Sequence, residues 1–127
     1  MAVIKSFREL IVYRKAFELA CKIHEVTRSF PRDEQFSLTD QIRRSSRSIC
    51  ANLAEAWGRK NYPKVFVNKL SDALAEQMET EVWLDFCFRH EYIDKATYST
   101  FLEDYGEVRR MLISMLNNPE RFYRDNQ

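Results

Sequence analysis

The side chains with the clearest potential for binding chemistry are basic and lie in one stretch of the sequence. The candidates for contact with a nucleic acid are Arg43, Arg47, Arg59, Lys60 and Lys64. Arg43 and Arg47 are four residues apart, so a helix would place them on one side. Trp57 and Tyr62 lie near the other three, and basic groups beside aromatic rings can bind phosphates and stack bases. The segment therefore predicts a surface that contacts phosphates.

The distribution of charge offers a second interpretation of the same residues. The whole chain has 20 basic and 19 acidic residues, and a formal charge of +1 predicts no strong general attraction to nucleic acid or membrane. Residues 41–70 contain seven basic residues and one acid, whereas residues 71–107 contain two basic residues and ten acids. Adjacent helices would pair much of this charge. We expect ion pairs with Glu76, Glu79 or Glu81 as the main outcome, and nucleic-acid contact as the alternative.

A further polar set is expected inside the fold. Asn52 and Glu55 are three residues apart in one predicted helix, and Glu76 and Glu79 repeat that spacing in the next. A buried carboxylate needs a cationic partner, which the arginines at 43, 44 and 47 could supply. We therefore expect a structural polar layer that fixes helix register and could extend to a subunit interface. Ser45, Ser46 and Ser48 occupy positions where bulk is usual, and small polar residues there let helix backbones approach closely or host a buried polar network.

The residue types that enzymes use for catalysis are present, but they are not spaced as a metal centre, an activated nucleophile or a phosphate-binding loop requires. A di-iron centre in a helical bundle needs Glu-x-x-His on two helices, and the sequence contains no such tetrapeptide. Cys50 and the neighbouring serines have no His and acid at a spacing that would activate them. The isolated Gly58 and Gly106 form no phosphate-binding loop. We expect no enzyme activity, no metal and no cofactor.

The cysteines and the apolar runs indicate a cellular compartment. Cys21, Cys50 and Cys87 are odd in number and form no C-x-x-C motif, which favours reduced, buried thiols. No stretch approaches the about 20 consecutive apolar residues of a membrane span. The first residues contain no apolar run of signal-peptide length. We expect a cytoplasmic protein that binds no membrane.

The elements that must position these side chains are predicted to be four helices. Two glycines and three prolines are too few to punctuate a β-rich chain. Apolar residues recur at spacings of three and four within residues 7–30, 38–57, 62–90 and 95–116. Short links between long helices force antiparallel neighbours. The pattern predicts one all-α domain over residues 1–127, an antiparallel up-down-up-down four-helix bundle.

The helix ends carry recognisable signals. Ser6 and Glu9 match a capping box, and Ser37, Asn61 and Asp94 are expected N-caps of the later helices. Pro63 suits a first helical turn. Pro31, Gly58 and Pro119 mark ends, and Gly58 is expected at the position where a left-handed conformation is common.

The apolar surface exceeds what one bundle core needs. The first predicted helix has a second stripe of Tyr13, Phe17, Ala20 or Cys21, and His24. Trp83, Phe86 and Phe88 form an apolar girdle late in the third, and they are predicted oligomer or core contacts. An exposed patch of this kind marks an interface, so we expect a homo-oligomer.

The sequence resembles the bacterial four-helix-bundle proteins encoded in intervening sequences of large-subunit ribosomal RNA genes. The matching residues are Gln41-Ile-Arg-Arg, Ser48-Ile49, Asn52-Leu-Ala-Glu55 and Arg59, with Phe30-Pro31, Leu38, Phe66 to Asp72, Glu76, Glu79, Thr80, Trp83 and Leu84. They cover about residues 7–116, and Ala56 stands where many members have Gly.

The resemblance implies a four-helix bundle assembled into a homopentameric ring, in a family that generally lacks a defined activity. A similar protein, the accessory variability determinant of diversity-generating retroelements, is a basic pentameric barrel that binds nucleic acid and a reverse transcriptase. Two functional hypotheses follow. The first is a non-enzymatic ring-forming scaffold that binds a macromolecular partner, and the alternative is an accessory protein that binds RNA or DNA.

Overall fold

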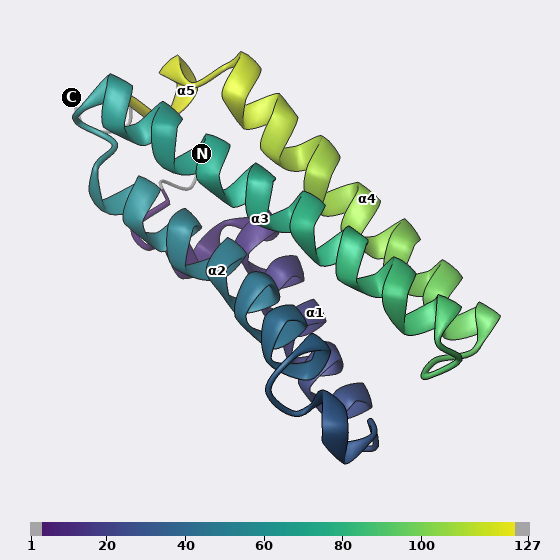
Figure 1. The fold of residues 1–127 in the computed structure, drawn as a ribbon. Coiled ribbons are helices and arrows are strands. Elements are labelled where there is room, and N and C mark those ends of the chain that lie inside the picture. Colours follow the sequence, from purple (N-terminus) through teal and green to yellow (C-terminus); the bar gives the residue numbers. More distant parts are fainter. Residues whose placement is uncertain (1–3, 124–127) are drawn as a thin grey trace.

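The computed structural model describes residues 4–123 and is all-helical over that range. Its four long helices are α1 (Ile11–Thr27), α2 (Leu38–Gly58), α3 (Pro63–Arg89) and α4 (Lys95–Asn117). Three short elements accompany them: η1 (Phe7–Glu9), η2 (Arg32–Glu34) and α5 (Glu120–Tyr123). Figure 1 shows the long helices lying side by side, joined by short turns. The prediction of an all-α chain with four long helices is confirmed.

Each long helix packs against its neighbour in sequence, and α1 also packs on α4. An ion pair of 3.0 Å between Lys15 Nζ and Glu107 Oε1 joins these two outer helices. At the end of the bundle that holds the α2–α3 turn, α5 lies over the start of α3, and the rings of Phe66 and Phe122 are 5.7 Å apart. No helix within residues 4–123 is both long and apolar enough to cross a membrane.

The first helix differs from its prediction at both ends. The capping box forms, with Glu9 Oε2 accepting from Ser6 N at 2.9 Å, but it closes a 3-10 turn rather than the start of a long helix. Leu10 is extended and turns its side chain into the core, so α1 begins at Ile11. Its end at Thr27 precedes the predicted Phe30, because the N–H groups of Arg28 and Phe30 donate to carbonyls three residues back, Glu25 O and Thr27 O, which replaces the α-helical pattern by tight turns.

The caps of the later helices were predicted with mixed success. Asp94 caps α4 by accepting from Thr97 N at 2.8 Å, as predicted. Ser37 does not cap α2, because its hydroxyl donates to Glu34 at 2.6 Å instead. Tyr62, not Asn61, precedes α3, although Pro63 is its first residue. Gly58 remains helical, and the left-handed residue among those described is Glu91, in the α3–α4 turn, with φ of 63°.

The core between α2 and α3 combines large apolar side chains with small ones. Leu53, Phe66, Leu70 and Leu84 are almost completely buried. Ser45 and Thr80 are also buried, and their hydroxyl oxygens lie 2.8 Å apart across the two helices. Thr80 Oγ1 is 2.9 Å from Glu76 O, so this pair is satisfied within the core. Of the two predicted roles of the α2 serines, the buried polar contact therefore forms at Ser45.

Candidate functional site

The basic residues predicted to contact nucleic acid separate into two groups along α2. Arg43 and Arg47 face α1, whereas Arg59, Lys60 and Lys64 lie at the α2–α3 turn. Sixteen helical steps at about 1.5 Å each put roughly 24 Å between Arg43 and Arg59. The five residues therefore do not form one patch.

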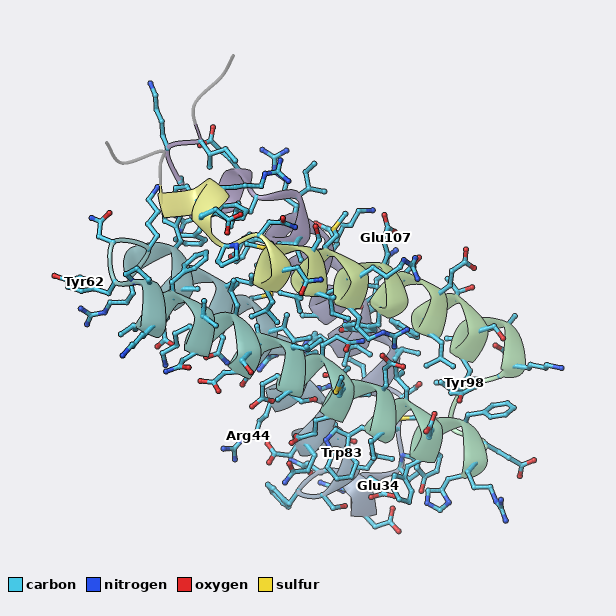
Figure 2. All side chains as sticks on the ribbon, turned by 90° about the horizontal axis from the view of Figure 1, so that it is seen from above. Glu34, Arg44, Tyr62, Trp83, Tyr98 and Glu107 are labelled. Atoms are coloured by element: carbon cyan, nitrogen blue, oxygen red, sulfur yellow. The ribbon has the colours of Figure 1, made fainter. Side chains whose placement is uncertain are left out.

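The turn group combines cations with aromatic rings. Lys60 Nζ lies 3.4 Å from the centroid of the Trp57 ring, in a cation–π contact. Arg59, Tyr62 and Lys64 are exposed. Figure 2 shows Tyr62 pointing away from the body of the molecule at one end. This group has the composition of a surface that contacts phosphates and stacks bases.

The arginines nearer the start of α2 are held against α1 rather than α3. Arg43 Nε donates to Thr27 Oγ1 at 2.8 Å, and Arg47 Nη2 lies 3.3 Å from His24 Nδ1. Within residues 4–123 no ion pair joins them to an acid of α3.

The acids of α3 have other partners. Glu81 Oε2 accepts from Arg109 of α4 at 2.7 Å, and Glu79 accepts from Trp83 Nε1 of its own helix at 3.2 Å. Among the described residues no ion pair within 4 Å joins an α2 arginine to an α3 acid, because Glu81 is turned toward α4 and Glu79 is exposed. A weaker Coulomb attraction links Arg44 of α2 to Glu76 of α3. Within residues 4–123, the ion pair that joins α2 to α3 is formed by Lys69 of α3 and Glu55 of α2, at 3.1 Å.

The predicted polar layer does not form as one buried set. Glu55 and Glu79 are exposed, and Asn52 donates to Ser48 O within its own helix at 2.9 Å. Partial burial, together with the neighbouring Glu79 and Asp72, raises the pKa of Glu76 above its ordinary value.

A different buried polar set connects α3 to α4. Gln77 is fully buried, and its Nε2 donates to Tyr105 O at 3.1 Å and to the Glu81 carboxylate that also receives Arg109. Sequence reasoning missed this set, although the position of Gln77 on the apolar face of its helix was the available signal.

Large apolar side chains are exposed along the outer face of α3. Met78, Val82 and Phe86 are each nearly half exposed and follow one another at helical spacing. Trp83 is partly buried 5.9 Å from Phe86, and Figure 2 shows it near Glu34. With Phe36, which is 86% exposed, these residues form what we term the α3 ridge. Phe88 lies apart from it and stacks on Tyr98 at 4.5 Å.

A second apolar surface lies between α1 and α2. An open groove of about 500 Å³ is lined by Tyr13, Phe17, Ala20, Cys21, His24, Glu25, Arg47 and Cys50. These include the second stripe predicted from the sequence, and Phe17 is 47% exposed. We term this surface the α1–α2 groove. It shares no residue with the α3 ridge.

The nucleophilic and metal-ligating side chains are dispersed. Cys21 is exposed, unlike the buried thiol expected, whereas Cys50 is half-buried and Cys87 buried. Burial raises the pKa of Cys50 to about 11 and that of Cys87 to about 12, so both remain thiols at neutral pH. The part of the chain that the structure describes contains no group of three His, Cys, Asp or Glu side chains placed to hold a metal ion.

Comparisons with known proteins place the chain in a family. The family model for the 23S rRNA-intervening sequence protein matches residues 8–114. A crystal structure of a protein of unknown function from the S23 ribosomal protein family of Bacteroides thetaiotaomicron is 35% identical, with a TM-score of 0.77. That similarity covers 85% of this chain and 96% of the other. No curated protein matches the sequence. The resemblance predicted from the sequence is thus confirmed, and the chain belongs to the family of 23S rRNA-intervening sequence proteins.

Proposed function

We propose that this protein is a non-enzymatic scaffold that assembles into a homopentameric ring and binds a macromolecular partner. The observation that carries the proposal is the presence of two separate exposed apolar surfaces, the α1–α2 groove and the α3 ridge. A ring is built from heterologous contacts, in which one surface of each protomer meets a different surface of the next. The number five comes from the family resemblance.

The charges beside the two surfaces support their pairing. Arg47 lines the α1–α2 groove together with Glu25, while the exposed acids Asp72, Glu79 and Asp85 lie on the same helix as the α3 ridge. Opposite charges around an apolar contact favour one orientation and disfavour others. We therefore propose that the ridge of one protomer enters the groove of the next.

Native mass measurement tests the assembly. A pentamer of 15.2 kDa chains has a mass of about 76 kDa. A monomer that persists at every concentration would contradict the ring.

A mixing experiment tests the two surfaces separately. Phe17→Asp should disable the groove and Val82→Asp the ridge, so each variant alone is expected to be a folded monomer. An equal mixture retains one intact groove and one intact ridge, and should form a dimer that cannot grow. Ile113→Asp is the matched control, because Ile113 is 40% exposed on α4 outside both surfaces. If a ring still forms in Phe17→Asp or in Val82→Asp, the surface changed in that variant is not part of the ring interface. The ring itself would not be contradicted by that result.

Nucleic-acid binding is a second candidate function, favoured by the composition of the α2–α3 turn. Arg59, Lys64 and Tyr62 are exposed beside the Lys60–Trp57 contact. Replacing Arg59 and Lys64 with Ala should weaken binding to a single-stranded RNA and lower the slope of log affinity against log salt by about 1.4, two phosphate contacts at about 0.7 each. Fluorescence anisotropy between low and moderate salt measures this. Lys95→Ala on α4 is the control. If it weakens RNA binding as much as the replacement of Arg59 and Lys64 does, the binding reflects general electrostatic attraction and not a site at the turn.

A further inference from the structure

A polar pocket of about 360 Å³ lies where the end of α1 and η2 meet the start of α2. Six side chains in its wall can donate hydrogen bonds: Thr27, Arg28, Arg32, Gln35, Thr39 and Arg43. Three of the six are arginines, and no carboxylate lines the pocket. The sequence separates these arginines by up to 15 residues, so the tertiary fold brings them together.

Arg43 is fixed in this pocket before any ligand arrives. Its Nε donates to Thr27 Oγ1 at 2.8 Å, and Thr27 Oγ1 in turn lies 2.7 Å from Ile23 O. Thr27 is buried and Arg43 half-buried, so the guanidinium has little freedom. A side chain held in this way loses less entropy when its remaining N–H groups bind an anion.

The guanidinium groups have little competition from acids of the protein. No carboxylate lies within ion-pair distance of Arg32 or Arg43 among residues 4–123. Arg28 contacts Glu25 at 3.5 Å, but both side chains are about two-thirds exposed or more, and such a pair is weak. The pocket therefore concentrates positive charge.

Thr39 supplies an independent observation in the same wall. The residue is 6% exposed, and its hydroxyl oxygen has no hydrogen-bond partner in the protein. Buried polar groups without a protein partner are rare, and an ordered water or ion commonly completes their hydrogen bonding.

We propose that this pocket binds a phosphate group, carried by a phosphomonoester. A tetrahedral phosphate dianion offers three oxygens to arginines that approach from different elements, whereas a carboxylate matches a single guanidinium fork. The pocket is larger than one phosphate, so it leaves room for the group that the phosphate is attached to. A free phosphorylated metabolite and the phosphorylated end of a nucleic-acid strand share this chemistry. The proposal does not depend on the ring.

Isothermal titration calorimetry of the 127-residue chain with inorganic phosphate, at constant ionic strength, tests the site. Arg32→Gln and Arg43→Gln are each expected to weaken phosphate binding about tenfold, the loss expected for one charge-assisted hydrogen bond. Arg32 is exposed, so its replacement leaves the fold intact even if Arg43→Gln disturbs the contact with Thr27. Arg44→Gln is the matched control, because Arg44 is an exposed arginine of α2 that lies outside the pocket near Asp40.

Two probes distinguish the sources of the phosphate. A ribonucleoside 5′-monophosphate and an RNA oligonucleotide with either a 5′-phosphate or a 5′-hydroxyl are titrated into the same variants. If the oligonucleotide with the 5′-phosphate binds more tightly than the one with the 5′-hydroxyl, and Arg32→Gln removes this difference, the ligand is a strand end. If the monophosphate binds more tightly than the phosphorylated oligonucleotide, the ligand is a small molecule. The proposal is overturned if inorganic phosphate shows no saturable binding, or if Arg44→Gln weakens it as much as Arg32→Gln does. The variant with Ala at positions 59 and 64, in the α2–α3 turn, should bind inorganic phosphate as tightly as the parent even if it no longer binds RNA.

Discussion

Glu34 shows how one side chain connects η2 to the α3–α4 turn. Its Oε1 accepts from Ser37 Oγ at 2.6 Å, and its Oε2 accepts from Tyr92 Oη at 2.9 Å. These hydrogen bonds to the ionised form hold the pKa of Glu34 below its ordinary value of 4.5. Figure 2 shows Glu34 close to the end of the bundle that also holds Trp83.

The lowered pKa of Glu34 predicts a contribution to stability that depends on pH. Because the folded-state pKa is depressed, the stabilisation is complete above the ordinary value of 4.5 and is lost as pH falls through the folded-state pKa. Glu34→Gln should lower the free energy of unfolding at pH 7 by about 1 kcal/mol, after allowance for solvent screening. Urea denaturation at a series of pH values measures this. The difference between the proteins should shrink as pH falls below 4.5, and a constant difference would contradict the assignment.

Among the elements, α2 and α3 are distinguished by the small side chains between them. Ala56 and Ala73 are buried in the same helix pair as Ser45 and Thr80, so the two backbones can approach closely. The periodicity of the sequence predicted this for α2, because serines stood where bulk was expected. The partner of Ser45 could not be predicted, since the relative register of two helices depends on all their contacts.

The close approach at Ser45 predicts sensitivity to added volume. Ser45→Leu should lower the free energy of unfolding by about 2–3 kcal/mol, because a tightly packed interior cannot accept the extra methylene groups without strain. Ala51→Leu, on the exposed side of the same helix, should change it by less than about 0.5 kcal/mol. Urea denaturation of the two variants provides the comparison. Equal stability of Ser45→Leu and the parent would show that the helices are not closely packed at this position.

Element boundaries were less predictable than element identity. The apolar stripes located all four long helices, since a helix must bury one face. The ends depend on single hydrogen bonds, and there the local signals competed. Ser37 had the chemistry of a cap but bonded to Glu34, whereas Asp94 had no rival partner and capped α4.

At the scale of the whole molecule, the net charge of +1 conceals two interactions that the sequence did not reveal. The acids of α3 were expected to neutralise the arginines of α2, but Glu81 pairs with Arg109 of α4. Arg43 is instead held by Thr27 of α1, so basic groups remain on the α1–α2 side of the bundle. This separation gives the proposed phosphate pocket its charge.

The proposed ring predicts a thermal stability that depends on protein concentration. Association that favours the folded state raises the melting temperature as concentration rises. Scanning calorimetry over about a hundredfold range of concentration should therefore show a rising melting temperature for the parent protein and for Ile113→Asp. The melting temperature of Val82→Asp should be the same at every protein concentration. A parent melting temperature that does not change with concentration would argue against assembly.

The sequence by itself determined the helical class, the four long helices and the family, because apolar periodicity and local motifs are properties of neighbouring residues. It also identified the second apolar stripe of the first helix and the basic residues of α2. Only the tertiary structure decided which polar side chains meet. The pairing of Thr80 with Ser45, the burial of Gln77 and the gathering of Arg28, Arg32 and Arg43 depend on the register between helices. That register results from the packing of the whole core, which no local segment encodes.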